Sequence, residues 1–294
     1  MKSPDLGLVS APASAPTSDA WDRAAQGWNQ HAALIRVWLR EVTAAMLDAA
    51  CLAPGSRVLD IAAGAGGQTL DIAHRVGPQG RVLATDLSAR ILALAKDNAR
   101  AAGLTQVDTR VADAQALGLA GADFDAAVCR LGLMFCQAPH SALAEVCAAL
   151  RPGGRFSALV FSQPQFNPCL AVMMSTALRH AGVPAKSPFE PGSLMSLSKP
   201  GLLAQLLSDA GFVDIDVRPL AAPFDMPTSQ HYVDFVRTSG SPIMEILAPL
   251  SAGEQADAWD DMTAQLNVFA TPTGWQGPNE LLLCAATRPG SRTG

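Results

Sequence analysis

From Ser56 onward, short apolar runs rich in β-branched residues alternate with stretches that have helical spacing. We expect strands at 58–61, 81–86, 107–113, 124–130 and 155–161, and two more at 212–220 and 280–288. Strands that alternate with helices pair in parallel, because each helix carries the chain back to the same end of the sheet. The sequence therefore predicts an α/β fold with a doubly wound, mostly parallel seven-stranded sheet.

The composition narrows the possible partners and compartments. The chain has 294 residues, of which 49% are hydrophobic, and a net charge of −5. An acidic chain without a run of Lys or Arg argues against nucleic acid as a partner. No apolar run approaches the roughly 20 residues that span a bilayer, so we expect no membrane partner. Six cysteines without a C-x-x-C pair indicate free thiols in a reducing cytoplasm and no metal site. We expect a cytoplasmic monomer or homodimer.

Around the predicted sheet, the chain divides into segments of different character. Residues 1–19 contain several Pro and Ser residues and are expected to form a disordered arm, whereas 20–294 form a single domain. Within it, 20–51 predict N-terminal helices, 56–161 the ligand-binding core, and 162–197 and 221–274 two insertions, the second mostly helical. We expect the N-terminal helices and both insertions to act as lids over a substrate.

The stretch "VLDIAAGAGGQT" leads from the first strand through a glycine-rich turn into a helix. A dinucleotide-binding turn has a third glycine at the position that Thr69 occupies here. Asp60, at the end of the strand, would repel a pyrophosphate and attract a cationic group. We therefore expect a ligand that is cationic at this end and nucleoside-like elsewhere.

Three acidic residues stand at or near the ends of three consecutive predicted strands: Asp60, Asp86 and Asp113. Asp86 lies at the distance from the glycine turn at which an acid accepts hydrogen bonds from ribose hydroxyls. Asp113 is suited to a donor such as the exocyclic amine of adenine. Each aspartate alone has a structural alternative, which is to cap the helix that follows it. Together they favour a nucleoside site at the carboxyl edge of the sheet.

In this order, the motifs resemble those of the class I S-adenosylmethionine-dependent methyltransferases. "VLDIAAGAGGQT" resembles their first motif, "LATDLS" their ribose-binding segment and "VADAQAL" their adenine-contacting segment, and "FDAAVCRLGLMF" with "ALRPGGRF" resembles their fourth-to-fifth-strand region. Within the class, the chain looks closest to the small-molecule enzymes of the ubiquinone/menaquinone-biosynthesis type. The resemblance implies a Rossmann-like methyltransferase fold and S-adenosylmethionine as the cofactor. Ala62 departs from the pattern, since many members carry glycine there.

The resemblance also implies a role for individual residues. The turn would hold the methionine moiety, and Asp60 would order the loop or attract the α-ammonium. Asp86 would hold the ribose, and Asp113 with the backbone of Ala114 would hold the adenine. The full set expected to bind the cofactor is Asp60, Ala62, Ala63, Gly64, Gly66, Thr69, Asp86, Leu87, Asp113, Ala114, Arg130 and Leu131.

We expect methyl transfer by in-line displacement to a small, largely apolar organic acceptor, at oxygen, carbon or nitrogen. Candidate general bases are His31 and His231, and candidate substrate contacts are Trp28, Met134, Phe161 and Met173. Proximity alone, without a base, is the alternative mechanism, and the apolar residues of the insertions have the alternative of forming their own core. Two other functions stay open: a non-catalytic S-adenosylmethionine-binding or regulatory protein, and a nicotinamide-dependent oxidoreductase.

Overall fold

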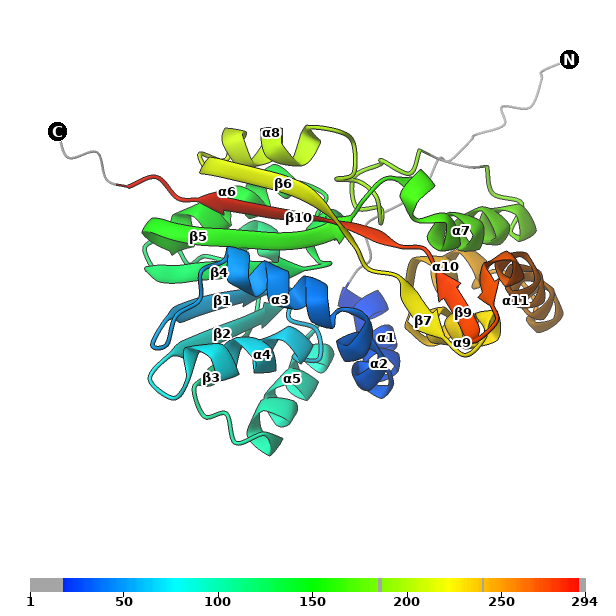
Figure 1. The fold of residues 1–294 in the computed structure, drawn as a ribbon, viewed down its shortest axis with the longest axis horizontal. Helices are drawn as coiled ribbons and strands as arrows, with labels where there is room; N and C mark the ends of the chain where they lie inside the picture. The colour runs from blue at the N-terminus through cyan, green and yellow to red at the C-terminus, as the bar shows by residue number, and fades with distance from the viewer. Residues whose placement is uncertain (1–17, 185–186, 240, 291–294) are drawn as a thin grey trace, which may run out of the picture.

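The main sheet has seven strands in the order β3-β2-β1-β4-β5-β10-β6 (Figure 1). The computed structural model describes residues 18–184, 187–239 and 241–290. The strands of the sheet are β1 (Arg57–Ile61), β2 (Arg81–Asp86), β3 (Val107–Val111), β4 (Phe124–Arg130), β5 (Leu150–Phe161), β6 (Val213–Ala221) and β10 (Glu280–Thr287). Strands β1 to β5 pair in parallel, and β10 is antiparallel to both β5 and β6. The predicted mostly parallel, seven-stranded sheet is confirmed.

Helices cover both faces of this sheet (Figure 1). One face carries α3 (Arg40–Ala49), α4 (Gly67–Val76) and α5 (Ala89–Ala101), and the other carries α6 (Pro139–Ala149) and α8 (Leu202–Asp209). Local sequence signals set the helix ends: α4 lies between two glycines with positive φ, Gly66 and Gly77, and the Ser88 hydroxyl caps α5 by accepting from the Ile91 N–H. The reversal of strand order at β1 and β4 leaves a crevice at the carboxyl ends of these strands.

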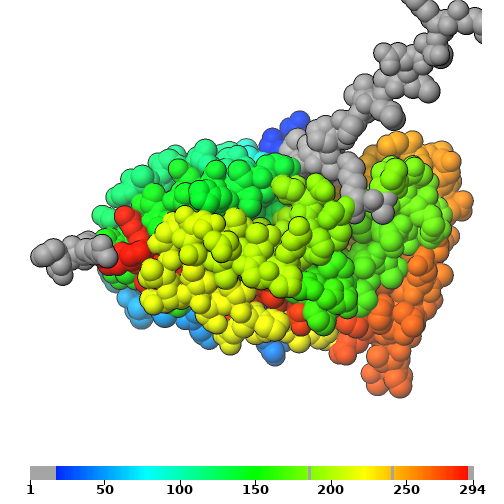
Figure 2. Space-filling view, turned by 90° about the horizontal axis from the view of Figure 1, so that it is seen from above, coloured from blue at the N-terminus to red at the C-terminus, as the bar shows by residue number. Residues whose placement is uncertain are grey.

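A second layer of structure, which we call the cap, lies beyond the carboxyl ends of the parallel strands (Figure 1). It comprises α7 (Pro168–His180), α9 (Ser229–Ser239), α10 (Ser241–Leu247), α11 (Ala252–Leu266) and a small sheet of β7 (Phe224–Met226), β9 (Gly274–Gly277) and β8 (Ala270–Thr271). Helices α1 (Ser18–Gln30) and α2 (Ala32–Trp38) lie between the cap and the main sheet. Figure 2 shows the face formed by α8 and β6, which the cap continues at one end.

Sheet and cap share one hydrophobic core. Leu59 and Phe156 of the sheet belong to the same cluster of buried side chains as Tyr232 and Met262 of the cap. The described residues also form four short 3-10 helices, η1 (Ala114–Ala116), η2 (Leu133–Phe135), η3 (Pro164–Phe166) and η4 (Asn267–Phe269). None of the described helices is long and apolar enough to cross a membrane.

Some predicted boundaries differ from the structure. Strand β5 begins at Leu150 and not at residue 155. The residues predicted to form a turn before the strand instead form a bulge within it, in which Gly153, with φ 76°, donates its N–H to the Arg288 carbonyl. Residues 1–17 of the predicted arm lie outside the described residues, and α1 already begins at Ser18. The cap sheet was not predicted, since strands of two to four residues are too short to show an alternating pattern.

Candidate cofactor site

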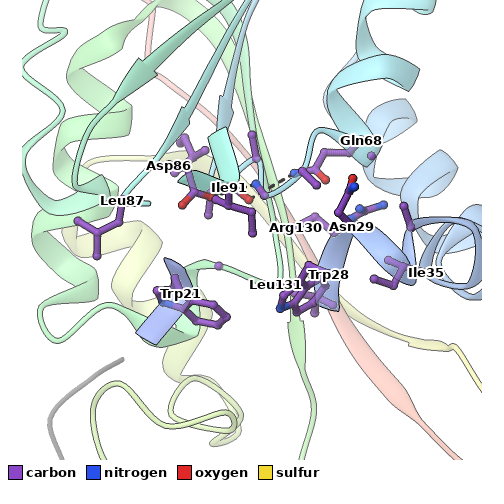
Figure 3. Close-up of a pocket in the computed structure, with 18 of the residues that line it drawn as sticks. Trp21, Trp28, Asn29, Ile35, Gln68, Asp86, Leu87, Ile91, Arg130 and Leu131 are labelled. Carbon is purple, nitrogen blue, oxygen red and sulfur yellow. Dashed lines mark hydrogen bonds between the residues drawn. The ribbon is translucent and has the colours of Figure 1, made fainter. Parts of the chain in front are cut away.

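A cavity of about 850 Å³ lies at the carboxyl edge of the sheet, between the strand ends and helices α1 and α2. Its floor is formed by residues that end or follow β1, β2, β3 and β4, and its opposite wall by Trp21, Trp28, Ile35 and Leu39. Asp86, Leu87 and Trp21 lie toward one end in Figure 3, and Arg130, Gln68 and Asn29 toward the other. The cavity is therefore acidic at one end and lined by nitrogen donors at the other.

The glycine turn owes its shape to Asp60. Asp60 is fully buried below the turn, where its carboxylate accepts hydrogen bonds from Gln68 Nε2 at 3.0 Å and Thr69 Oγ1 at 2.6 Å. Burial raises the pKa of Asp60 to about 6, against the lowering effect of both bonds and of nearby Arg130. Asp60 does not line the cavity, so of its two expected roles the geometry fits the ordering of the loop.

The turn brings the backbone to the cavity surface. Ala62 and Gly64 have positive φ values of 53° and 57°, and both line the cavity. Gly66, with φ 88°, packs against α5, and a Cβ there would lie 3.0 Å from Ala95. Glycine at 66 thus serves close helix packing behind the cavity, while the stretch from 62 to 65 faces it.

The second and third acids both lie in the cavity wall, where each accepts backbone N–H groups. Asp86 accepts from the N–H of Gly64 at 2.9 Å and of Ser88 at 3.0 Å, and burial raises its pKa. Asp113 accepts from the Gln115 N–H at 2.9 Å. Each aspartate orders the turn after its strand and still presents a carboxylate to the cavity.

Arg130, at the end of β4, forms the opposite end of the cavity. Its Nη1 donates to Thr43 Oγ1 at 2.9 Å, and among the described residues no carboxylate oxygen lies within 4.0 Å of its guanidinium. Burial lowers its pKa to about 10, which leaves it charged at neutral pH. It lies against the first residue of α4, where a Cβ on Gly67 would be 3.1 Å from Nη2, and no side chain caps this helix. A half-buried cation beside a helix N-terminus suits an anionic ligand group.

An aromatic wall faces the sheet. Trp21 of α1 packs edge-to-face on Phe135, with ring centroids 4.9 Å apart, and both rings line the cavity. Trp28 also lines it, and its indole nitrogen is buried without a hydrogen-bond partner. These rings make the wall above the strand ends predominantly apolar.

Comparison with known proteins identifies the family. A family model described as a methyltransferase domain matches residues 58–154. The demethylmenaquinone methyltransferase of Bacillus cytotoxicus is 31% identical over 192 residues, which are 63% of this chain and 79% of that protein. The chain belongs to the class I S-adenosylmethionine-dependent methyltransferases of the ubiquinone/menaquinone-biosynthesis type.

Other relatives of the chain match over a shorter range. The ubiquinone/menaquinone biosynthesis C-methyltransferase of Erwinia tasmaniensis is 34% identical over 134 residues, 45% of this chain and 52% of that protein. The chain thus spans about half the length of such relatives. Among solved structures, a putative methyltransferase from Bacillus halodurans C-125 has a TM-score of 0.58 at 19% identity and covers 84% of this chain and 98% of its own. That likeness shows the shared fold.

Most residues expected to bind the cofactor lie together in the structure. The cavity is lined by Ala62, Ala63, Gly64, Asp86, Leu87, Asp113, Ala114, Arg130 and Leu131, and Asp60, Gly66 and Thr69 lie behind it. Their contacts with the cofactor stay predictions. Trp28, an expected substrate contact, is in the wall.

Other expected substrate and catalytic residues lie elsewhere. Met134, Phe161 and Met173 do not line the cavity, because η2, the end of β5 and helix α7 bury these side chains in the hydrophobic core. His31 lies between α1 and α2 and faces α9 of the cap, where its Nε2 lies 2.7 Å from Thr238 Oγ1. His231 is exposed in the cap, and its Nδ1 lies 2.8 Å from Thr228 Oγ1. The structure brings neither histidine to the cavity.

Sequence reasoning missed many of the lining residues, among them Asn29, Arg36, Gln68 and Phe135. Gln68 directly follows the glycine turn, and that position is a usable signal. Arg36 and Asn29 belong to helices outside the sheet, and only the tertiary fold shows which of their faces meets the cavity.

Proposed function

We propose that this protein binds S-adenosylmethionine in the cavity and transfers its methyl group to a small, largely apolar organic acceptor. One observation carries the proposal: a single cavity holds two strand-end carboxylates at one end and a half-buried guanidinium at the other. The cofactor has matching chemistry, since its nucleoside offers hydroxyl and amine donors and its amino-acid end carries a carboxylate. The residues of the cavity therefore fit the group that the family implies.

The fit assigns roles along the cavity. Asp86 with Leu87 would hold the ribose, Asp113 with Ala114 the adenine, and the turn from Ala62 to Gly64 the methionine chain. Arg130 and the N-terminus of α4 would receive the carboxylate. When bound, S-adenosylmethionine supplies a methyl group on a positively charged sulfur.

The chain itself contributes orientation and shielding. Trp21, Phe135, Trp28 and Leu131 form an apolar surface on which an organic acceptor can pack beside the cofactor. Helices α1 and α2 cover this surface and keep water away from the reacting atoms. Correct alignment of two reactants can contribute several kcal/mol, with about 7–11 kcal/mol as the upper range. The acceptor class agrees with the names of the curated relatives, which refer to ubiquinone and menaquinone biosynthesis.

Calorimetry tests the cofactor assignment first. We expect S-adenosylhomocysteine to bind and NADH to give no heat, and the reverse result would support the oxidoreductase alternative. Transfer of a labelled methyl group from S-adenosylmethionine to a panel of small aromatic and enolic acceptors then tests the reaction. Binding of the cofactor product without transfer to any acceptor would favour the non-catalytic binding protein.

A further inference from the structure

The side chain of Asp22 joins the covering helix α1 to the end of the cavity that holds Asp86. Asp22 lies one residue after Trp21, and its Oδ1 accepts a hydrogen bond from the Ser88 hydroxyl. The same oxygen lies 3.4 Å from the backbone nitrogen of Arg90, at the start of α5. Asp22 does not itself line the cavity. Its contacts therefore bear on how α1 is positioned.

Ser88 is the residue at which α1, α5 and the cavity meet. It is fully buried, and its hydroxyl donates to Asp22 while accepting from the Ile91 N–H at 3.0 Å. Its own N–H donates to Asp86 Oδ1 at 3.0 Å, and Asp86 Oδ2 accepts from the Gly64 N–H at 2.9 Å. A continuous chain of hydrogen bonds thus runs from α1 through Ser88 and Asp86 to the glycine turn.

Two carboxylates accept hydrogen bonds from Ser88 at the N-terminus of α5, Asp86 from its N–H and Asp22 from its hydroxyl. The positive end of the helix dipole stabilises both charges, but the charges repel each other. The electrostatic effect of Asp22 adds to burial in raising the pKa of Asp86. Any ligand that donates hydrogen bonds to Asp86 spreads its negative charge, which weakens the repulsion of Asp22 and strengthens the docking of α1.

We propose that Asp22 is a positioning residue that holds α1, and with it Trp21, over the nucleoside end of the cavity, and that it couples this closure to occupancy at Asp86. The inference rests on the proposed cofactor site. Coupling between two sites is reciprocal. A ligand at Asp86 therefore tightens α1, and the Asp22 contact in turn slows the release of that ligand.

A matched control lies on the same helix. Arg23 follows Asp22, faces the cap and pairs with Glu245 of α10 at 3.7 Å, with both side chains largely exposed. Arg23→Ala removes a charged contact of α1 without changing its link to α5. Asp22→Asn keeps an oxygen that can accept from Ser88 and serves as the conservative variant.

The experiment measures S-adenosylhomocysteine on the full chain, by calorimetry for affinity and by stopped-flow tryptophan fluorescence for release. Loss of a hydrogen bond to a charged group in Asp22→Ala should weaken affinity about 10-fold, mostly through faster release. Asp22→Asn should recover affinity to within about 3-fold of wild type, since neutral hydrogen bonds are roughly half as strong as charged ones. Arg23→Ala should behave as wild type.

Hydrogen exchange separates positioning from a general structural role. In wild type and Arg23→Ala, S-adenosylhomocysteine should slow exchange of the α1 amides, and in Asp22→Ala this ligand-dependent protection should be lost. If Asp22→Ala does not fold, Asp22→Asn in a Ser88→Ala background provides the test, and there its effect should vanish. If Asp22→Ala and Arg23→Ala behave alike while wild type binds S-adenosylhomocysteine normally, the inference about Asp22 is overturned and the proposed function is not. Failure of wild type to bind S-adenosylhomocysteine overturns the proposed function and this inference with it.

Discussion

The buried carboxyl group of Asp60 should make this protein less stable as the pH rises from about 4 to about 6. Burial raises the pKa of Asp60 from 3.8 to about 6, so the folded state binds the proton more tightly than the unfolded chain does. The stabilisation is therefore complete below the unfolded pKa and is lost as the pH rises through the folded pKa. At about 1.4 kcal/mol per pH unit, the difference between 3.8 and about 6 corresponds to about 3 kcal/mol.

Urea unfolding of wild type and Asp60→Asn between pH 4 and pH 7.5 measures this contribution. All other titrating groups are shared, so the difference in the free energy of unfolding between the two proteins isolates Asp60. We expect wild type to lose about 3 kcal/mol relative to the variant across this range. Thr69→Val removes the donor of the 2.6 Å bond and should move the midpoint of the loss to higher pH. A difference that does not change with pH would refute the assignment of a raised pKa to Asp60.

Three further predictions concern the cavity and its surroundings. Asp86→Ala should weaken S-adenosylhomocysteine binding in calorimetry by about 2 kcal/mol or more, from the loss of hydrogen bonds to a charged acceptor, and unchanged affinity would remove Asp86 from the site. Catalysis should survive exhaustive chelation, since the described residues include no group of His, Cys, Asp and Glu arranged to hold a metal, and activity lost with EDTA and restored by a divalent ion would contradict this. His31→Ala should leave the pH–rate profile unchanged and lower the free energy of unfolding by about 1 kcal/mol, because His31 contacts Thr238 and not the cavity. A changed profile would instead support His31 as a general base.

The carboxyl-edge part of the cavity was predictable because its residues lie at strand ends. Parallel strands bring their carboxyl ends to one edge, so Asp86 and Asp113 had to be near each other once the strands were placed. The edge position of β6 was also visible, from the alternation of Val213 and Ile215 with Asp214. In both cases the sequence pattern is local, and the pairing of the strands determines where its residues lie.

The apolar wall proposed for the acceptor was not predictable, because it depends on how separate layers pack. The methionines and phenylalanines of the insertions were equally compatible with a substrate pocket and with an internal core, and Met173 illustrates the second outcome, since it is fully buried. Periodicity identifies an apolar face but not the surface it meets. The contact of Trp21 with Phe135 joins residues more than one hundred positions apart, and no local sequence pattern predicts it.

Helix α1 lies between the cap and the cavity, and no described cap residue lines the cavity itself. A shift of the cap therefore reaches the cavity through α1. Gly27 lies against α9 so closely that a Cβ there would be 1.9 Å from the Thr238 carbonyl oxygen. A larger residue at 27 would have to push α1 away from α9 and toward α5, because the backbone of α9 cannot yield as a side chain would. In the proposed function, the width available to an acceptor thus depends on contacts behind the cavity wall. Variants on the face of α9 that contacts α1 should alter acceptor size without altering the proposed cofactor contacts.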